Sequence, residues 1–456
     1  MRKNDIVPLE ITGMTNEGNG VGRYEGMAVF VPLTAVGDKI DCRIVKVQKS
    51  FCYGIIERLI APSQHRCEPE CGVFSKCGGC AFRHFTYEEE LRVKLDFVRS
   101  SFERIGKLDL LPESITGSEK TAHYRNKAQY PVAMQEGRAV CGFYSRRSHR
   151  VIEQHSCNLQ PEIFEGIIDR IMGYVNQNAI PAYDEITGKG ALRHIYLRRG
   201  ENTGEIMLCL VLTSKAHIKS FEGLYPALVS EFEDIKSIVI NINSKNTNAI
   251  LGNEYITAFG KGTIDDIMCG RRVTLSPSSF YQVNTPQAQR LYGKAAEYAA
   301  LKEGEILLDL YCGTGTIGLS LIKDGCRLIG ADIVPSSIEN AKRNAIQNGI
   351  ENAEFICADA AKAAQVFYER GERPDVIIAD PARKGCDRAT LELMAKMSPK
   401  RIVMISCDHS TAARDIAVLR ELGFEMTRCE AVDLFPRTAH VECISLMERS
   451  KSNDRA

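Results

Sequence analysis

The segment LLDLYCGTGTIG, residues 307–318, decides the fold, because it leads from an apolar strand through a glycine-rich loop into a helix. Glycines allow a tight turn and let a ligand approach the backbone, while the helix N-terminus offers free N–H groups. Gly313, Gly315 and Gly318 have the G-x-G-x-x-G spacing, so spacing alone leaves an NAD-dependent dehydrogenase open. The segment therefore predicts a nucleotide-binding loop at the edge of a sheet.

On both sides of this loop the chain alternates between strand, loop and helix. The expected strands are 305–311, 327–333, 353–358, 375–380 and 401–406. This alternation indicates a parallel sheet with helices on both faces. We therefore expect an α/β, doubly wound, Rossmann-like domain over residues 271–456.

Aspartates follow or end the later strands of this sheet. Asp332, Asp359 and Asp380 all fall at carboxyl ends, which meet at one edge where ligands bind. Asp332 would accept hydrogen bonds from ribose hydroxyls, and Asp359 would lie near an adenine. In the alternative interpretation, the three aspartates only cap helices. The D-x-x-C-G-x-G form that begins at Asp309 is more typical of S-adenosylmethionine (SAM) methyltransferases than of dehydrogenases, so we expect SAM.

A cysteine and a carboxylate lie near the end of the chain. Cys407 follows the strand 401–406, and Glu442 lies at the start of a later strand. Carbon 5 of uracil attacks a sulfonium methyl group only after a thiolate has added to carbon 6, and a base must then remove the carbon 5 proton. The pair predicts methylation of carbon 5. Arg383 or a helix N-terminus would favour the thiolate, and Asp408 would oppose it.

Four cysteines crowd one short segment as Cys67-x3-Cys71-x5-Cys77-x2-Cys80. The N-terminus has no apolar stretch typical of a secretory signal, so we expect a cytoplasmic protein with reduced thiols. Four thiolates this close indicate a metal site. Zinc and an iron–sulfur cluster both accept four thiolates, and spacing does not decide between them.

The rest of the chain predicts two further domains. Residues 1–62 alternate apolar and polar residues with glycine turns, which indicates a small β-barrel. Residues 63–270 mix strands and helices; a helix near 87–106 has an apolar face that would pack on the catalytic domain. Basic residues that we expect to contact RNA occur at 123–127, at 146–147 and at Arg193, Arg198 and Arg199.

Composition excludes other classes of protein. Hydrophobic residues make up 44% and charged residues 25% of the 456 residues, which is typical of a globular chain. The 58 basic and 58 acidic residues balance, so nucleic-acid binding would require a local basic surface. No apolar run is long enough to span a bilayer, and we expect no membrane partner.

Beyond these inferences, the chain resembles the RNA uracil-5-methyltransferases. The similarity rests on FYQVN (280–284), DLYCGTG (309–315), DPARKG (380–385), SCD (406–408) and HVE (440–442). It implies that Cys407 is the nucleophile and Glu442 the base. It implies a SAM site formed by Gln282, Tyr311, Thr316, Asp332, Asp359 and Asp380. The family commonly has a proline where this chain has His409, which leaves the shape of that loop open.

The same resemblance extends to the cysteines and the first domain. It implies a [4Fe-4S] cluster on Cys71, Cys77, Cys80 and Cys157, with zinc, or Cys67 as the fourth ligand, as alternatives. Residues 1–62 resemble a TRAM domain, an OB-like RNA-binding barrel. The cysteines favour 23S rRNA as the substrate and tRNA is the alternative; we expect a monomer.

Two other interpretations compete with this one. A radical-SAM methylthiotransferase would also combine cysteines with a TRAM barrel, but it needs a C-x3-C-x2-C triplet, and this chain separates its middle cysteines by five residues. The other is a non-catalytic RNA-binding iron–sulfur protein. The presence of both Cys407 and Glu442 argues against it.

Overall fold

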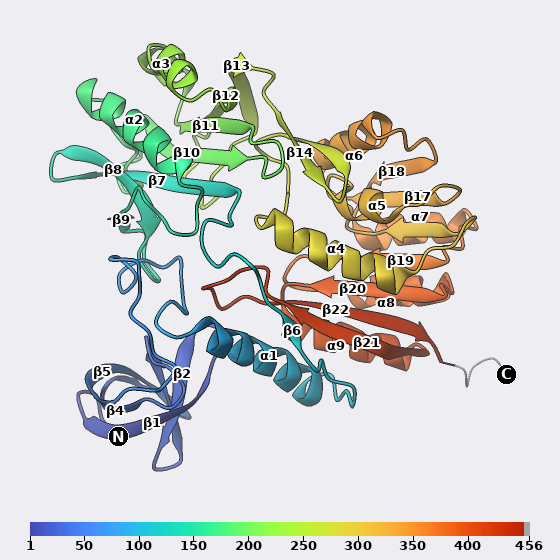
Figure 1. The fold of residues 1–456 in the computed structure, drawn as a ribbon, viewed down its shortest axis with the longest axis horizontal. Coiled ribbons are helices and arrows are strands. Elements are labelled where there is room, and N and C mark those ends of the chain that lie inside the picture. Colours follow the sequence, from blue (N-terminus) through green and yellow to red (C-terminus); the bar gives the residue numbers. More distant parts are fainter. Residues whose placement is uncertain (451–456) are drawn as a thin grey trace.

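A computed structural model describes residues 1–450, which form a closed β-barrel, two large sheets and a small two-stranded sheet (Figure 1). The helices are α1 (Tyr87–Arg104), α2 (Ile163–Gln177), the 3-10 helix η1 (Lys215–Phe221), α3 (Leu224–Glu231), α4 (Thr285–Ala299), α5 (Thr316–Leu321), α6 (Pro335–Gln347), α7 (Ala360–Glu369), α8 (Arg388–Lys396) and α9 (His409–Glu421). The strands before α4 are β1 (Ile6–Met14), β2 (Asn19–Tyr24), β3 (Met27–Pro32), β4 (Lys39–Val47), β5 (Phe51–Ala61), β6 (Ile115–Thr116), β7 (Lys127–Gln135), β8 (Arg138–Tyr144), β9 (Val151–Glu153), β10 (Leu192–Arg199), β11 (Ile206–Leu212), β12 (Ile235–Ile242), β13 (Glu254–Gly260), β14 (Ile264–Met268) and β15 (Arg271–Leu275). The strands after α4 are β16 (Ile306–Asp309), β17 (Arg327–Asp332), β18 (Ala353–Cys357), β19 (Val376–Ala379), β20 (Arg401–Ser406), β21 (Phe424–Val432) and β22 (Glu442–Arg449).

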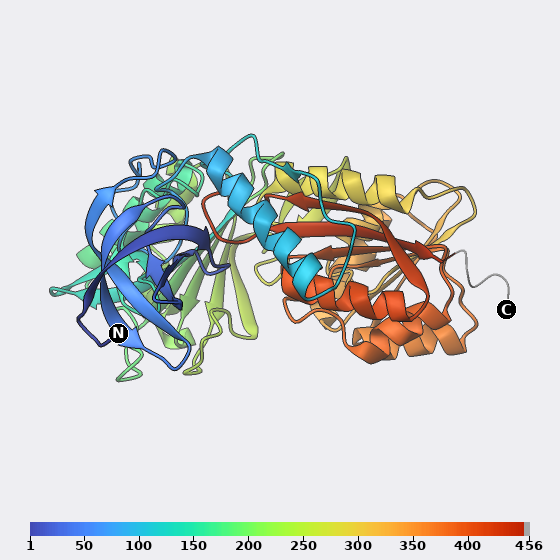
Figure 2. The same ribbon diagram turned by 90° about the horizontal axis from the view of Figure 1, so that it is seen from below.

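The N-terminal strands close into a barrel in the order β1-β2-β3-β5-β4. Alternate residues of β1, namely Val7, Leu9 and Ile11, point into its core, as a strand with one buried face requires. Buried Asp38 fixes the exit from the barrel, because it accepts hydrogen bonds from the N–H groups of Ala35 and Ser63. The barrel lies at one end of the molecule and the C-terminal sheet with its helices at the other (Figure 2).

The middle of the chain forms a sheet in the order β13-β12-β11-β10-β7-β8-β9. Every residue of β11 is buried, which matches its uninterrupted apolar sequence IMLCLVL. Helices α2 and α3 contribute to the core on one face of this sheet, where Ile167, Ile171 and Leu228 pack with strand residues. The opposite face contributes Tyr196 and Met207 to a core shared with the C-terminal part of the chain.

The C-terminal sheet has the order β18-β17-β16-β19-β20-β22-β21-β6. Strands β16 to β20 are parallel, and β22 inserts antiparallel between β20 and β21. Residues of α4, α5 and α6 pack on one face and residues of α7, α8 and α9 on the other. The predicted doubly wound α/β fold is therefore confirmed, and the strand 401–406 coincides with β20.

Helix α1 belongs to the C-terminal sheet by its packing. Thr86 caps it by accepting a hydrogen bond from the Glu89 N–H, and acidic residues fill its first turn, as the helix dipole favours. Its Val98 and Phe102 lie in the core on the α9 face of the sheet. Figure 2 shows the helix running alongside the C-terminal domain. No helix within residues 1–450 is long and apolar enough to cross a membrane.

Candidate active site

Strand order brings Cys407 and Glu442 to the same edge of the sheet. Ser406, the last residue of β20, pairs with Cys443 of antiparallel β22, so Cys407 and Glu442 occupy the next position of the ladder. On the other side of β20 lies β19, which is followed at once by Asp380. Cys407 is partly exposed, whereas the Glu442 side chain is only 2% exposed.

The charges at this edge oppose ionisation of both groups. Burial raises the pKa of the Cys407 thiol to about 12; the carboxylates of Glu442 and Asp380 act in the same direction, and Arg383 opposes them. Burial, followed by the charge of Asp380, raises the pKa of Glu442 well above its ordinary value. One oxygen of Glu442, Oε2, is buried without a hydrogen-bond partner among the described residues. The site therefore holds an acceptor that the protein itself leaves unused.

The residues after Cys407 form the start of helix α9. Asp408 caps this helix by accepting hydrogen bonds from the N–H groups of Ser410 and Thr411, both at 3.0 Å. His409 is buried, stacks near Phe97 and lies 2.7 Å from the Ser101 hydroxyl of α1 through Nδ1. His409 is thus a packing residue at the α1–α9 contact. The Asp408 carboxylate is directed at the backbone donors of its own helix.

The glycine-rich loop after β16 has the geometry of a nucleotide-binding loop. Gly313 and Gly315 adopt φ values of 53° and 84°, which side chains disfavour. Asp309 is fully buried and accepts a hydrogen bond from the Gly318 N–H at 3.0 Å. Asp332 accepts hydrogen bonds from the N–H groups of Gly313 (3.1 Å) and Val334 (2.8 Å), so one carboxylate joins the loop to the end of β17.

The other predicted SAM residues differ in their surroundings. Gln282 and Thr316 are buried, and Tyr311 is half-buried and packs on the α7–α9 side of the sheet. Asp359 is exposed and caps α7 by accepting from the Lys362 N–H at 3.0 Å; for this aspartate the capping role considered from the sequence is present.

Two apolar side chains that sequence reasoning missed lie beside Asp332. Ile333 is 67% exposed and Val334 is 43% exposed, directly after the carboxyl end of β17. Exposed apolar residues at the edge where a nucleotide would lie provide a surface for a planar base. The signal in the sequence was an apolar pair in a position where a loop residue is usually polar.

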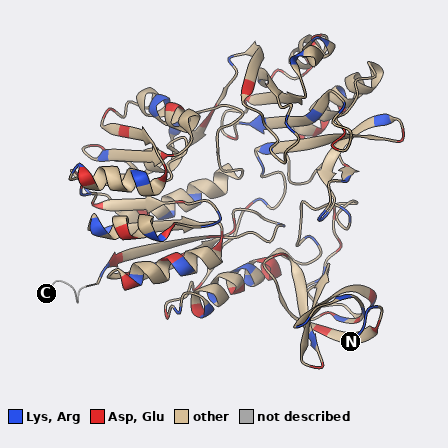
Figure 3. Ribbon diagram, turned by 180° about the vertical axis from the view of Figure 1, so that it is seen from behind, with Lys and Arg blue, Asp and Glu red and all other residues tan. Residues whose placement is uncertain are grey.

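A cleft of about 870 Å³ opens onto Cys407. The lining includes Cys407 and His440 from the C-terminal part, Lys46 and Tyr53 from the barrel, and Arg125 from the middle part. Arg146, Arg147 and Arg383 add positive charge to the same lining. Lysines and arginines occur on all three parts of the molecule (Figure 3). The cleft therefore combines the candidate nucleophile with a basic surface and an aromatic ring.

Some of the arginines predicted to contact RNA have internal roles. Arg193 is 3% exposed and donates to the carbonyl oxygens of Asn243 and Lys245. Arg198 is 1% exposed and donates to the carbonyl oxygens of Ser276 and Ser279. The prediction was wrong for these two arginines because β10 is a central strand, and its guanidinium groups hold loop carbonyls instead of facing solvent.

The cysteines predicted as metal ligands surround one small cavity. Cys71, Cys77, Cys80 and Cys157 all line a cavity of about 70 Å³ between the cysteine segment and residues 154–160. Cys67 does not line this cavity; its side chain is exposed and lies near the Arg83 carbonyl. Within residues 1–450 no group of three or more Cys, His, Asp or Glu side chains is arranged to hold a single metal ion.

The five-stranded barrel, the strand order of the C-terminal sheet and the glycine-rich loop together define the class of protein: a TRAM-like barrel joined to a SAM-dependent methyltransferase domain. Comparison with known proteins identifies the family. Residues 86–450 match the model of the tRNA (uracil-5-)-methyltransferase family, and residues 2–56 match the TRAM domain. The chain belongs to this family and is an RNA methyltransferase that uses SAM.

Related sequences and a solved structure match this chain over nearly its full length. An uncharacterised RNA methyltransferase of Clostridium acetobutylicum is 42% identical over 98% of both chains. One of Oceanobacillus iheyensis is 40% identical over 99% of this chain and 98% of its own. The structure of Pyrococcus abyssi tRNA (uracil-54, C5)-methyltransferase with S-adenosyl-L-homocysteine superposes with a TM-score of 0.77, at 24% identity, over 97% of this chain and 100% of that one. It shows that the fold is shared.

Proposed function

We propose that this enzyme methylates carbon 5 of a uridine in 23S rRNA through a covalent bond between Cys407 and carbon 6 of the uracil. The observation that carries the proposal is the position of Cys407 and Glu442 at neighbouring ends of β20 and β22, at the mouth of a basic cleft. Transfer to oxygen or to an exocyclic nitrogen requires no cysteine, whereas transfer to carbon 5 does.

Together with SAM, these two side chains account for every bond that forms and breaks in the proposed reaction. The Cys407 thiolate adds to carbon 6, and the electron pair moves to carbon 5 as part of an enolate. Carbon 5 takes the methyl group of SAM, and the sulfonium becomes the thioether S-adenosylhomocysteine. Glu442 then removes the proton from carbon 5, and the bond between Cys407 and carbon 6 breaks to return the thiolate.

The electrostatics predict how the rate depends on pH. Because the pKa of Cys407 is raised to about 12 and that of Glu442 is raised, both groups are predominantly protonated at low pH. The proposed steps need both in the ionised form, so the rate should increase as the pH rises. The Arg383 guanidinium, which lowers the pKa of both groups, favours the reactive forms.

SAM supplies the methyl group, and we assign its site to the glycine-rich edge. Asp332 would accept from the ribose hydroxyls, because a carboxylate that already accepts two N–H groups retains further lone pairs. Ile333 and Val334 would cover one face of the adenine. Gln282, Tyr311, Thr316, Asp359 and Asp380 are assigned to the same site by the family resemblance.

The choice of 23S rRNA over tRNA rests on the cysteines. The four sulfurs that we assign to a [4Fe-4S] cluster line one cavity, with Cys157 rather than Cys67 as the fourth. Zinc and a four-iron cluster both accept four thiolates, so the choice of the cluster rests on the family resemblance. Tyr53 and Lys46 suit the barrel to a single-stranded segment.

The cluster can be tested by anaerobic reconstitution with iron and sulfide. Cys157→Ser should lose the charge-transfer absorption and most of the bound iron, and Cys67→Ser should keep both. The reverse result would make Cys67 the ligand, and binding of zinc without iron would favour the zinc alternative.

The substrate can be tested by methyl transfer from isotope-labelled SAM to 23S rRNA and to tRNA transcripts. After digestion, label in 5-methyluridine from 23S rRNA supports the proposal. Label in 5-methyluridine from tRNA alone would keep the chemistry and change the substrate. No label in either RNA, with RNA binding intact, would favour the non-catalytic RNA-binding protein.

A further inference from the structure

The loop between β21 and β22 carries the chain directly into Glu442. Residues far away in the sequence hold this loop through its backbone. The Tyr124 hydroxyl donates to the Pro436 carbonyl at 2.9 Å, and the Asn284 side chain donates to the Leu434 carbonyl at 3.1 Å. The N–H group of Ala81, next to Cys80, donates to the Arg437 carbonyl at 2.8 Å. The position of the loop is therefore imposed from outside the strands that it connects.

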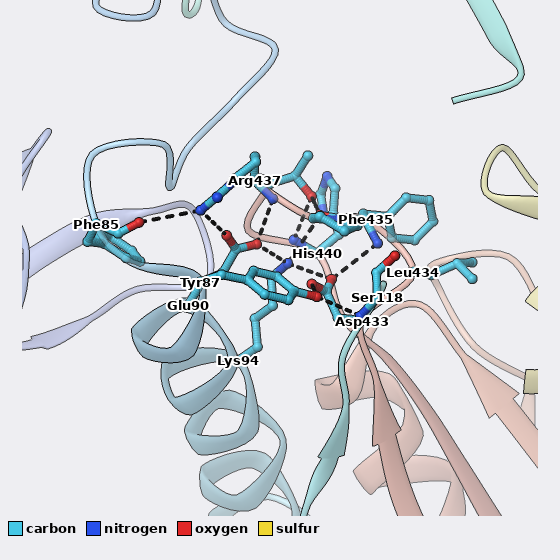
Figure 4. Close-up of polar contacts among 12 residues, drawn as sticks. Phe85, Tyr87, Glu90, Lys94, Ser118, Asp433, Leu434, Phe435, Arg437 and His440 are labelled. Carbon is cyan, nitrogen blue, oxygen red and sulfur yellow. Dashed lines mark hydrogen bonds and ion pairs between the residues drawn. The ribbon is translucent and has the colours of Figure 1, made fainter. Parts of the chain in front are cut away.

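The strongest of these restraints is a buried group of charges around Lys94 of α1 (Figure 4). The Lys94 ammonium has an exposed side-chain fraction of 0% and lies 2.7 Å from both the Glu90 and the Asp433 carboxylates. It also donates to the Phe435 carbonyl at 3.1 Å. The Tyr87 hydroxyl donates to the other oxygen of Asp433 at 2.7 Å.

Glu90 extends the network further along the loop. Its Oε1 accepts a hydrogen bond from the Arg437 N–H at 2.6 Å, and its Oε2 lies 3.5 Å from the Arg437 guanidinium. Arg437 has a φ of 69°, a left-handed conformation that a non-glycine residue adopts only under restraint. The network thus holds the loop in a shape that the loop would not adopt alone.

Packing of α1 does not require these charges. Val98 and Phe102 already anchor the helix in the apolar core, and burying three charged groups costs more than burying apolar side chains of similar volume. The charged side chains form hydrogen bonds with two backbone groups of the loop, the Phe435 carbonyl and the Arg437 N–H, and apolar side chains cannot form such directional bonds. These hydrogen bonds fix the direction of the backbone.

We propose that Lys94, with Glu90 and Asp433, is a positioning residue for Glu442 and controls removal of the proton from carbon 5. This inference rests on the proposed function. Its consequence is selective: displacing the loop should slow resolution of the RNA adduct by a much larger factor than its formation, in which the loop takes part only through His440 in the cleft lining. Cys407 follows β20, and the glycine-rich loop follows β16, so neither is carried by the loop between β21 and β22.

The test compares Lys94→Met with Arg92→Met on unmodified substrate RNA. Met keeps the length of Lys94 and removes its charge; Arg92 is a half-exposed arginine on the same helix, paired with Glu89 and Asp96 and outside the Lys94 network. We measure SAM affinity, single-turnover methyl transfer, and the fraction of RNA that stays bound to protein on a denaturing gel. Lys94→Met should resolve the adduct about 10- to 100-fold more slowly, as misplacement of a catalytic group predicts, and so accumulate methylated adduct. SAM affinity should be unchanged, and Arg92→Met should behave as wild type.

Equal slowing of methyl transfer and resolution, or a loss that matches the unfolded fraction, would overturn the positioning role. If Lys94→Met does not fold, the double variant Lys94→Met with Glu90→Gln removes the charge of one of the two carboxylates that Lys94 pairs, and the same selectivity is expected. Failure of the proposed function is distinguishable, because wild type would then form no adduct with 5-fluorouridine RNA.

Discussion

Replacing Glu442 by glutamine should separate methyl transfer from product release. The side chain is 2% exposed, and burial together with Asp380 raises its pKa well above the ordinary value. Glutamine has nearly the same shape and no charge, so it fills the same space. It cannot accept the proton from carbon 5, and general-base catalysis contributes about 10²- to 10⁴-fold. We expect turnover to fall by about 1000-fold, or about 4 kcal/mol in activation free energy.

Stability should not explain this loss. A carboxyl group with a raised pKa in the folded protein favours folding only below its unfolded pKa, and that contribution is lost as the pH rises. At neutral pH glutamine escapes the cost of burying a charge, so the melting temperature of Glu442→Gln should equal or exceed that of wild type.

The assay follows labelled methyl transfer from SAM and RNA–protein adduct on the same samples. Glu442→Gln should transfer about one methyl group per enzyme and keep it in a covalent, denaturant-resistant adduct with ordinary RNA. Glu448→Gln on the same strand β22 is the matched control, since Glu448 lies away from the cleft and pairs with Thr427. Turnover of Glu442→Gln within tenfold of wild type, or loss of activity without adduct, would refute the assignment of the base.

Three further substitutions test the surroundings of the site. Asp332→Asn should weaken S-adenosylhomocysteine binding by about 10- to 100-fold in calorimetry, because it loses a charged acceptor; unchanged affinity would move the ribose site elsewhere. Gly318→Ala should weaken S-adenosylhomocysteine binding and lower the melting temperature, since a Cβ would lie 2.8 Å from Leu328 Cδ1 and 3.1 Å from Asp309 Oδ2. An affinity and a melting temperature equal to those of wild type would show that the glycine-rich loop can shift to make room for the methyl group. Burial lowers the pKa of His194 to about 4, so the unfolded chain binds its proton first, and this group alone should lower stability by about 1.4 kcal/mol per pH unit below pH 6.5. His194→Gln should reduce the pH slope of urea unfolding by about that amount, and an unchanged slope would contradict this.

The doubly wound domain was predictable because its signals are local. Each parallel strand is a short apolar run followed by a loop, and the expected strands differ from the observed ones by one or two residues at their ends. Cys407 and Asp380 could be placed at one edge for the same reason, since carboxyl ends of parallel strands meet there. The pairing of β22 with β20 gives Glu442 its place; from the sequence, Glu442 was singled out by its chemical pairing with Cys407 and by the family resemblance.

Contacts between distant segments were not predictable. Lys94 and Asp433 are 339 positions apart, and in the sequence Lys94 is one of many helix lysines. Arg193 and Arg198 show the converse error, because an arginine-rich strand looks like an RNA-binding surface until its carbonyl acceptors are known. His409 was expected near a loop and instead packs between α1 and α9, a contact that depends on where α1 docks.

The covalent step is tested most directly by RNA that carries 5-fluorouridine. Fluorine at carbon 5 cannot leave as a cation, so the bond between Cys407 and carbon 6 should persist after methyl transfer. With 23S rRNA fragments and SAM, wild type should give a SAM-dependent band of slower mobility on a denaturing gel, and Cys407→Ala should give none. An adduct that forms equally with Cys407→Ala, or none with 23S rRNA or tRNA, would contradict the mechanism.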